Sequence, residues 1–291
     1  MFLVNVHDTY VSRSLDLYGE WSEQEVAVFS LVVRKGDIAI DVGANLGAFT
    51  VPLANMVGST GAVIAFEPQR PMFQLLSANV ALNEFENVFA YNQAVGGSPG
   101  EVAVPRVNYG VEGNFGGISL AGEKEWASLG PFEMVKRVLL DDYLPRLSDC
   151  PSFVKVDVEG MEVDVLAGAV HLVERCRPVW HVENNCRKGS KEIIQFFATA
   201  GGYSLFWDVH TYFNAQNYNK NTEDVFTDKY LSMNVLAVPE SRGDLLEEFR
   251  GKGMVEVDVE GERWYLEEYV MRFKGDNVVI NQLGTMETCT R

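Results

Sequence analysis

The chain has 291 residues, 47% of them hydrophobic and 22% charged, which is typical of a folded globular protein and argues against long disordered segments. Its formal net charge of −17 would repel a phosphate backbone or an anionic lipid surface, so we expect neither nucleic acid nor a membrane as a partner. There is no basic, apolar leader and no run of about eighteen apolar residues, so we expect a cytoplasmic protein.

The cysteines support the same expectation. They form no C-x-x-C pair and do not have the spacing of a zinc site, so we expect reduced thiols of the cytosolic kind. The four are Cys150, Cys176, Cys186 and Cys289.

Helices and strands alternate through the first third of the chain. We expect a helix over residues 22–33, a strand over 37–43, a helix over 48–58, a strand over 62–68, a helix over 71–83 and a strand over 87–96. The strands are continuous apolar runs, as in sheets that are covered on both faces. This order predicts an α/β fold with a doubly wound, Rossmann-like and mostly parallel sheet.

The alternation stops between residues 96 and 147 and then resumes. Residues 101–107 and 117–120 are expected to pair as antiparallel strands of an inserted β flap over the edge of the sheet. Strand, helix, strand and helix follow, and the last two strands are expected to form an antiparallel hairpin; the six ranges are 152–160, 162–176, 178–184, 191–201, 203–210 and 233–239.

These boundaries predict three parts of the chain. Residues 1–35 form an N-terminal arm with the first helix, and residues 36–242 form the α/β domain, with residues 96–147 as its insertion. Residues 243–291 form a C-terminal extension that begins with an amphipathic helix.

The segment "DIAIDVGANLGAFT" is the strongest indication of a ligand site. Its strand ends in Asp41 and leads through Gly43 and Gly47 into a helix, and glycines there let a ligand approach the backbone closely. A dinucleotide site has the spacing G-x-G-x-x-G, whereas Asn45 occupies the place of the second glycine here. An acid before the loop would repel a pyrophosphate but suits S-adenosylmethionine, which carries an ammonium and a sulfonium group. The loop favours S-adenosylmethionine over NAD and leaves NAD open.

Glu67 ends the second strand, where a carboxylate accepts the ribose hydroxyls of either cofactor. A solvated acid at a strand end is the alternative interpretation.

Four blocks of the sequence together resemble the FkbM-type methyltransferases, a class I family that uses S-adenosylmethionine. They are "DVGANLGAFTVPLA…AVIAFEPQRPMFQLLSANVALNEFENV", "FVKVDVEGMEVDVLAGA", "WHVENN" and "SMNVLAVP", and the resemblance extends from about Gly19 to Pro239. It implies a seven-strand sheet with a terminal antiparallel hairpin and S-adenosylmethionine over the carboxyl ends of the first strands. It also implies methyl transfer to oxygen, with glycans, polyketides and other natural products as acceptors.

The resemblance implies cofactor contacts at particular residues. The loop residues are Asp41, Gly43, Asn45 and Gly47, the ribose residue is Glu67, and the residues at the adenine edge are Gln93 and Ala94. Tyr18 and Trp21 could cover the methionine end of the cofactor, or could instead pack the N-terminal arm on the core.

Acids and one imidazole are expected to converge beside the cofactor. "VKVDVEG" places Lys155, Asp157 and Glu159 at alternate positions of one strand, and the next strand places His181 and Glu183 on a shared side. Asp157 is the nearest partner for Lys155, which would be costly to bury alone.

Three interpretations of this cluster remain open. A histidine or carboxylate could act as general base, with His181 suited to neutral pH. Asp157, Glu159 and Glu183 could instead hold a divalent metal, although no D-x-D pair supports this. The cluster could also be a structural ion-pair network around Lys155. We favour base action over metal, and His210 could line the acceptor cleft.

The leading hypothesis is therefore O-methylation of a hydroxyl on a sugar, polyketide or similar small-molecule or glycan acceptor. One alternative is an NAD-dependent oxidoreductase built on the same sheet, and another is a non-catalytic, cofactor-binding partner protein. The sequence also lacks a Pro-Cys nucleophile, which argues against methylation of a base at C5 through a cysteine adduct.

Overall fold

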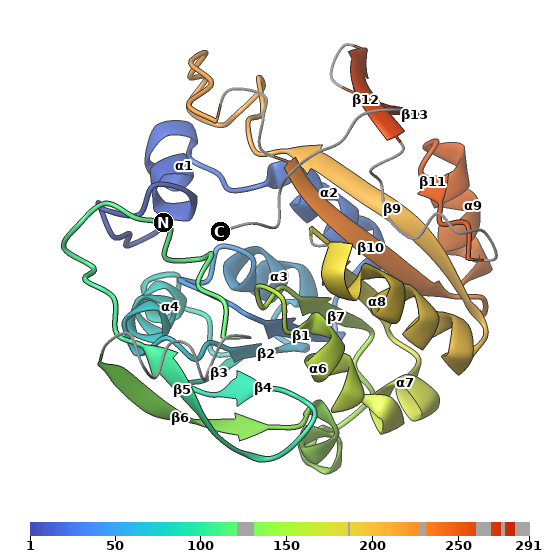
Figure 1. The fold of residues 1–291 in the computed structure, drawn as a ribbon, viewed down its shortest axis with the longest axis horizontal. Helices are drawn as coiled ribbons and strands as arrows, with labels where there is room; N and C mark the ends of the chain where they lie inside the picture. The colour runs from blue at the N-terminus through green and yellow to red at the C-terminus, as the bar shows by residue number, and fades with distance from the viewer. Residues whose placement is uncertain (121–130, 186, 227–230, 260–268, 275–276, 283–291) are drawn as a thin grey trace.

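An eight-stranded sheet forms the centre of the protein, which the computed structural model describes over residues 1–120, 131–185, 187–226, 231–259, 269–274 and 277–282 (Figure 1). In chain order its strands are β1 (Ile38–Val42), β2 (Ala62–Phe66), β3 (Val88–Tyr91), β7 (Phe153–Val156), β8 (Val179–Glu183), β9 (Tyr203–Thr211), β10 (Leu231–Pro239) and β11 (Val255–Glu256). In space they follow the order β11-β9-β10-β8-β7-β1-β2-β3.

The pairing confirms the doubly wound fold and the antiparallel hairpin. Neighbouring strands are parallel along the part of the sheet ordered β3-β2-β1-β7-β8. Beyond β8, strand β10 is antiparallel to β8, β9 is antiparallel to β10, and β11 is antiparallel to β9. The chain leaves β1 toward β2 on one side and later enters β7 on the other. Such a change of direction opens a crevice at the carboxyl ends of parallel strands, where ligands bind in this kind of fold.

Helices cover both faces of the sheet (Figure 1). Apolar side chains of α2 (Glu23–Val32), α3 (Thr50–Val57), α4 (Arg70–Leu82) and α9 (Gly243–Gly251) pack on one face. The opposite face is covered by η1 (Leu140–Arg146), α6 (Glu162–Ala167), α7 (Val170–Cys176) and α8 (Arg187–Ala200). Every residue of β1 and β7 is buried, as their continuous apolar runs predict. The remaining helix, α1 (Val11–Tyr18), belongs to the N-terminal arm.

The insertion differs from the expected flap. The strand expected over residues 87–96 is split, and its second piece, β4 (Ala94–Val95), joins a separate small sheet with β5 (Gly100–Pro105) and β6 (Phe132–Val138). The antiparallel partner of β5 is β6, so the pairing predicted with residues 117–120 is wrong. Residues 106–120, which we call the flap, instead cross the carboxyl end of the main sheet. A side chain at Gly116 would lie 2.9 Å from Nδ2 of Asn45, so the flap approaches the loop after β1 closely.

Three further differences concern single elements. The helix expected over residues 162–176 is broken into α6 and α7 at Gly168, where a Cβ atom would lie 2.2 Å from the carbonyl oxygen of Gly96. Strand β7 ends at Val156, before Asp157. The C-terminal extension adds β11 as the eighth strand of the sheet, and it also forms a hairpin of β12 (Tyr269–Lys274) and β13 (Asn277–Gln282).

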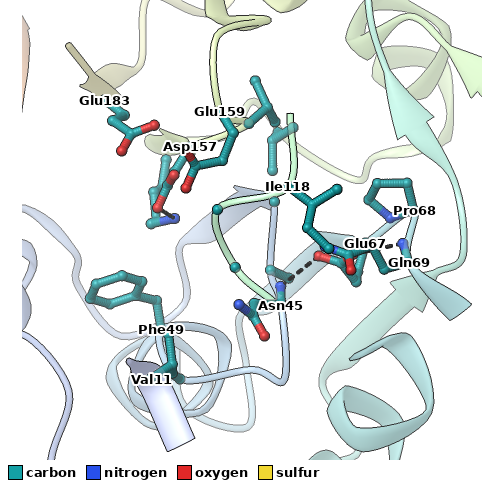
Figure 2. Close-up of a pocket in the computed structure, with 18 of the residues that line it drawn as sticks. Val11, Asn45, Phe49, Glu67, Pro68, Gln69, Ile118, Asp157, Glu159 and Glu183 are labelled. Carbon is teal, nitrogen blue, oxygen red and sulfur yellow. Dashed lines mark hydrogen bonds and ion pairs between the residues drawn. The ribbon is translucent and has the colours of Figure 1, made fainter. Parts of the chain in front are cut away.

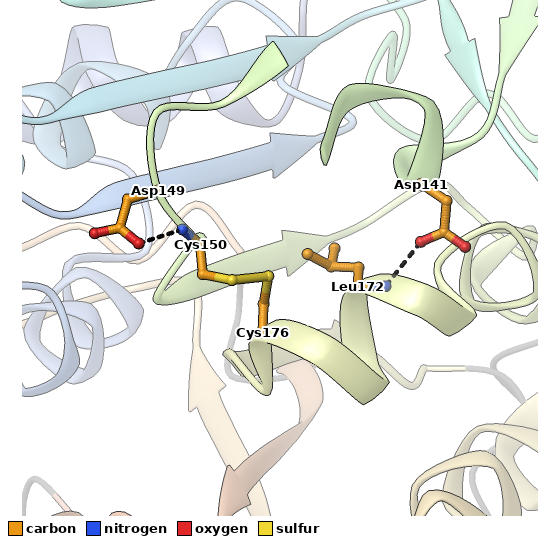
Figure 3. The surroundings of a disulfide bond; sticks show 5 residues. All are labelled: Asp141, Asp149, Cys150, Leu172 and Cys176. Atoms are coloured by element: carbon orange, nitrogen blue, oxygen red, sulfur yellow. Dashed lines mark hydrogen bonds between the residues drawn. A yellow bond between two sulfur atoms is a disulfide. The ribbon is translucent and has the colours of Figure 1, made fainter. Parts of the chain in front are cut away.

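A disulfide bond joins Cys150 to Cys176, so the expectation of reduced thiols is wrong for this pair (Figure 3). The two residues are 26 positions apart, and β7 with the two helices after it brings their Cα atoms to 5.2 Å. Sequence spacing does not reveal such a contact. Disulfides are rare in the reducing cytosol, so the cysteines no longer support the expectation of a cytoplasmic location. Cys186 and Cys289 lie outside the described residues.

In the part of the chain that the structure describes, no helix is long and apolar enough to cross a membrane.

Candidate active site

A deep cavity opens at the carboxyl ends of β1, β2, β7 and β8 (Figure 2). Its empty space, counted out to the open mouth, is about 1150 Å³. This is enough for a ligand of cofactor size together with part of a second molecule. The N-terminal arm, the flap and the connection between β9 and β10 complete its walls.

The loop after β1 forms the floor and has an unusual backbone. Gly43 has a φ of 82°, and a Cβ atom there would lie 1.8 Å from the carbonyl oxygen of Asp157, so only glycine fits. Asn45 also has a positive φ, of 51°, and its Oδ1 accepts a hydrogen bond from the backbone of Leu46. Gly43 and Asn45 line the cavity, whereas Gly47 shapes the turn against Leu76.

Glu67 lines the cavity at the end of β2 and is only 3% exposed. Its Oε2 accepts a hydrogen bond from the backbone N–H of Asn45 at 2.8 Å, and its Oε1 accepts one from that of Gln69 at 2.7 Å. Burial raises the pKa of Glu67 to about 7, although these two donors oppose the shift. Gln93 and Ala94 continue the same wall, and Gln93 accepts a hydrogen bond from the hydroxyl of Tyr143. The carboxylate and the two residues expected near adenine therefore border one space.

Asp41 lies beneath this floor and does not line the cavity. It is fully buried, accepts a hydrogen bond from Oγ1 of Thr50 at 2.6 Å and lies 3.8 Å from Nζ of Lys155. Burial raises its pKa, against the effect of the nearby ammonium. Asp41 is thus placed to hold Lys155 rather than to touch a ligand.

Three carboxylates converge on the opposite side of the cavity, as Figure 2 shows. Ligand oxygens of Asp157, Glu159 and Glu183 all lie within 4.8 Å of one another. Asp157 and Glu159 belong to the loop that follows β7, not to the strand, and Glu159 has a φ of 55°. The expected convergence is present, but a turn produces it instead of strand alternation.

Burial and neighbouring charge change the protonation of Glu159 and Glu183. Burial raises the pKa of Glu159 to about 8, and the carboxylate of Asp157 adds to the effect. Burial, followed by the carboxylates of Asp157 and Glu159, raises the pKa of Glu183 well above its ordinary value. Glu159 and Glu183 therefore keep a proton to higher pH than ordinary carboxyl groups do.

Lys155 is the only basic residue among the described residues that line the cavity. Its Nζ lies 3.1 Å from Oδ2 of Asp157 and 4.8 Å from the centre of the Phe49 ring. Although burial lowers its pKa, Asp157 and Asp41 outweigh burial and raise it. Lys155 is therefore a fixed cation whose charge is already balanced.

His181 does not line the cavity. It is 1% exposed, its Nε2 lies 2.8 Å from Oδ2 of Asp208, and its ring packs edge-on against Phe29. His210 contacts the same carboxylate at 2.6 Å and also lies outside the cavity lining. Burial would raise the pKa of Asp208, but the two histidines lower it. The structure thus places His181 in a buried pair behind the site.

Of the two aromatic candidates in the arm, only Trp21 lines the cavity. Tyr18 is buried away from the cavity, where its hydroxyl donates to the carbonyl of Glu223 and its ring packs on Phe213. Trp21 does line the cavity, and its ring stacks on that of Tyr212 with centroids 5.0 Å apart. The packing interpretation fits Tyr18, while Trp21 remains a candidate contact.

Several lining residues were not predicted from the sequence. They come from the arm, α2, the connection after β9, and β10, and they are Tyr10, Glu25, Tyr212 and Ser232. No local motif marks them, because only the packing of these distant segments brings them to the sheet's edge.

Comparisons with known proteins identify the family of the chain. The family model described as "Methyltransferase FkbM domain" matches residues 41–220. A curated relative, the 23S rRNA (uracil(1939)-C(5))-methyltransferase RlmD of Acinetobacter baylyi, is 40% identical over 63 residues, which are 22% of this chain and 14% of that protein. The matched stretch is thus a small part of that relative.

Two similar solved structures have low sequence identity. The methyltransferase FkbM from Methylobacillus flagellatus is 16% identical, with a TM-score of 0.46 over 73% of this chain and 50% of that chain. The O-methyltransferase TomG from Streptomyces achromogenes, solved in complex with SAM, is 13% identical, with a TM-score of 0.45 over 75% and 80% of the two chains. Because the family model matches more than half of the sequence, the chain belongs to the FkbM methyltransferase family.

Proposed function

We propose that the protein transfers a methyl group from S-adenosylmethionine to a hydroxyl group of a small-molecule or glycan acceptor. The observation that carries this proposal is a single cavity with two different ends. Glu67 and the loop after β1 line one end, and the carboxylates of Asp157, Glu159 and Glu183 line the other.

The residues at the first end suit S-adenosylmethionine. Glu67 would accept the ribose hydroxyls, Gln93 and Ala94 would border the adenine, and the backbone of Gly43 and Asn45 would meet the methionine part. When bound, the cofactor supplies an electrophilic methyl group on a cationic sulfur. The acids favour that positive charge, whereas a pyrophosphate would find Lys155 as the only basic group among the described lining residues, already paired with Asp157. NAD is therefore the weaker candidate.

At the second end, Glu183 is our candidate for the general base. It lines the cavity, and its raised pKa makes it a stronger base than an ordinary carboxylate. It would take the hydroxyl proton of the acceptor as the oxygen attacks the methyl carbon in line with the departing sulfur. Lys155 holds the neighbouring carboxylate of Asp157 in place.

A divalent metal is the second candidate at this end, because the same three carboxylates converge. The two alternatives respond differently to chelation. EDTA abolishes turnover if a metal is needed and leaves it unchanged if Glu183 acts alone.

The acceptor end also restricts the charge of the substrate. Glu25, Glu159 and Glu183 line it together with Trp21 and Tyr212. An anionic group would meet carboxylates there, so we propose a neutral or cationic acceptor whose ring packs on the aromatic wall.

The experiment is a turnover assay of the full chain with S-adenosylmethionine and a panel of neutral glycosides, amino sugars and polyketides. Release of S-adenosylhomocysteine that depends on the acceptor supports the proposal, and methylated oxygen in the product identifies the bond. Cofactor binding without turnover for any member would favour the non-catalytic alternative. Stabilisation by NAD rather than by S-adenosylhomocysteine in a thermal-shift comparison would favour the oxidoreductase.

A further inference from the structure

Gln69 connects the ribose end of the cavity to the flap. It lies directly before α4, lines the cavity and is 6% exposed (Figure 2). Its backbone N–H donates to Oε1 of Glu67 at 2.7 Å. Its side chain faces the flap, where Nε2 donates to the carbonyl oxygen of Phe115 at 2.8 Å and Oε1 accepts from the hydroxyl of Tyr109 at 2.6 Å. One residue therefore holds both the carboxylate and the flap.

The flap forms a wall of the cofactor cavity. Asn114, Gly116 and Ile118 line the cavity from this segment. The ring of Phe115 is buried and packs on that of Tyr109, with centroids 4.7 Å apart. Gly116 leaves no space for a side chain beside Asn45, whose own backbone N–H donates to Glu67. The flap and the carboxylate of Glu67 thus both contact Asn45 at the floor of the cavity.

The N-terminal arm holds the far part of the flap. Backbone hydrogen bonds join Thr9 to the carbonyl of Gly113, and Gly113 to the carbonyl of His7, each at 3.0 Å. The side chain of Asn5 donates to the carbonyl of Tyr109. These bonds attach the flap to the arm and involve neither Glu67 nor α4. Gln69 supplies side-chain hydrogen bonds from the edge of the sheet that carries Glu67.

We propose that Gln69 is a positioning residue that holds the flap closed over the cofactor once Glu67 has engaged the ribose; this inference rests on the proposed cofactor site. The backbone bond from Gln69 to Glu67 fixes the residue where the ribose would bind, and the side-chain amide then fixes Phe115 and Tyr109. Loss of the amide leaves a buried carbonyl and a hydroxyl without their partner, so the closed flap loses stability. Because Gln69 contacts Glu67 and the flap rather than the three carboxylates at the acceptor end, we expect its loss to lower the affinity for the cofactor.

The test uses the full chain and S-adenosylhomocysteine as the probe. Gln69→Met keeps the length of the side chain and removes both hydrogen bonds to the flap. Titration calorimetry should show a dissociation constant about tenfold higher than that of the wild type. Hydrogen exchange of residues 106–120 should show clearly less protection on addition of the probe. Gln195→Met, on the exposed face of α8, is the matched control and should behave as the wild type.

Two more variants separate coupling from a general packing defect. Gln69→Glu keeps an acceptor for Tyr109 but loses the donor to Phe115, so it should also weaken binding. Tyr109→Phe should weaken binding on its own but add nothing in the Gln69→Met background, since both changes remove the same hydrogen bond.

The outcomes are distinguishable. Unchanged affinity and unchanged ligand-induced protection in Gln69→Met would overturn the inference. So would faster exchange throughout the sheet with an unchanged ligand-induced difference at the flap, because that result describes a structural role only. Failure of the wild type to bind the probe would overturn the proposed function as well.

Discussion

Lys155 and Asp41 form an ion pair under the floor of the active site. They are paired in register across β7 and β1, Nζ lies 3.8 Å from Oδ1, and both residues are at most 1% exposed. The same ammonium lies 3.1 Å from Asp157 in the cavity. The acid at the end of the first strand therefore acts on the site through Lys155, and its own contact with a cofactor is not needed to explain why it is there.

The first prediction follows from this pair. Asp41→Asn keeps the size of the side chain but leaves Lys155 with less compensating charge, so the free energy of unfolding should fall by about 3 kcal/mol. Urea denaturation measures this, with Glu247→Gln on the exposed surface of α9 as the control. Wild-type stability of Asp41→Asn would mean that the pair is unimportant to the fold.

The second prediction separates Glu183 from His181. Glu183→Gln should lower kcat at least about 100-fold while the affinity for S-adenosylhomocysteine changes little, because the base acts on the acceptor. His181→Ala should mainly lower the melting temperature, because it removes one of the two histidines that contact the buried Asp208. A stable but inactive His181→Ala, together with an active Glu183→Gln, would contradict this assignment.

The third prediction concerns stability against pH. The pKa of Glu159 is raised from 4.5 to about 8, so between these values the folded state binds more protons than the unfolded state. Stability of the ligand-free protein should therefore fall as pH rises through this window. Glu159→Gln cannot lose a proton, so its melting temperature should fall less steeply between pH 5 and about pH 8. Parallel profiles for the variant and the wild type would show that Glu159 does not contribute.

The fourth prediction concerns the disulfide. The Cys150–Cys176 bond joins residues 26 positions apart and closes a loop that contains Asp157 and Glu159. Cys150→Ser with Cys176→Ser should lower the free energy of unfolding by about 3 kcal/mol. Dithiothreitol should lower the melting temperature of the wild type and leave that of the double variant unchanged. Equal sensitivity of both proteins to the reductant would argue against this bond.

Much of the fold and part of the site were predictable because they depend on local patterns. Apolar runs and helical spacing specify the parallel strands, and parallel strands bring their carboxyl ends to one edge. This is why Glu67 and Glu183, which lie at the ends of β2 and β8, were predicted from position and both line the cavity. Gln93 came from the family resemblance, and Asp157 reaches the cavity through the turn after β7.

The remainder depends on contacts between distant segments. Tyr212 reaches the cavity because the connection after β9 packs on the N-terminal arm, where its ring stacks on Trp21. His181 shares a strand face with Glu183. The sequence does not show that its ring would instead contact Asp208 of β9, outside the cavity. The predicted pairing of β5 with residues 117–120 was wrong for the same reason, since its true partner β6 follows the flap in the chain.

The measurement that tests the central claim most directly is calorimetric titration of the wild type and Glu67→Ala with S-adenosylhomocysteine and with NAD. Glu67 lines the cavity, so its loss should remove the ribose contact. The variant also leaves two backbone donors without their acceptor, so a thermal melt of Glu67→Ala must first show a cooperative transition. We expect the wild type to bind S-adenosylhomocysteine, Glu67→Ala to bind it at least about tenfold more weakly, and neither to bind NAD measurably. Equal binding of S-adenosylhomocysteine by both proteins, or tighter binding of NAD by the wild type, would contradict the account.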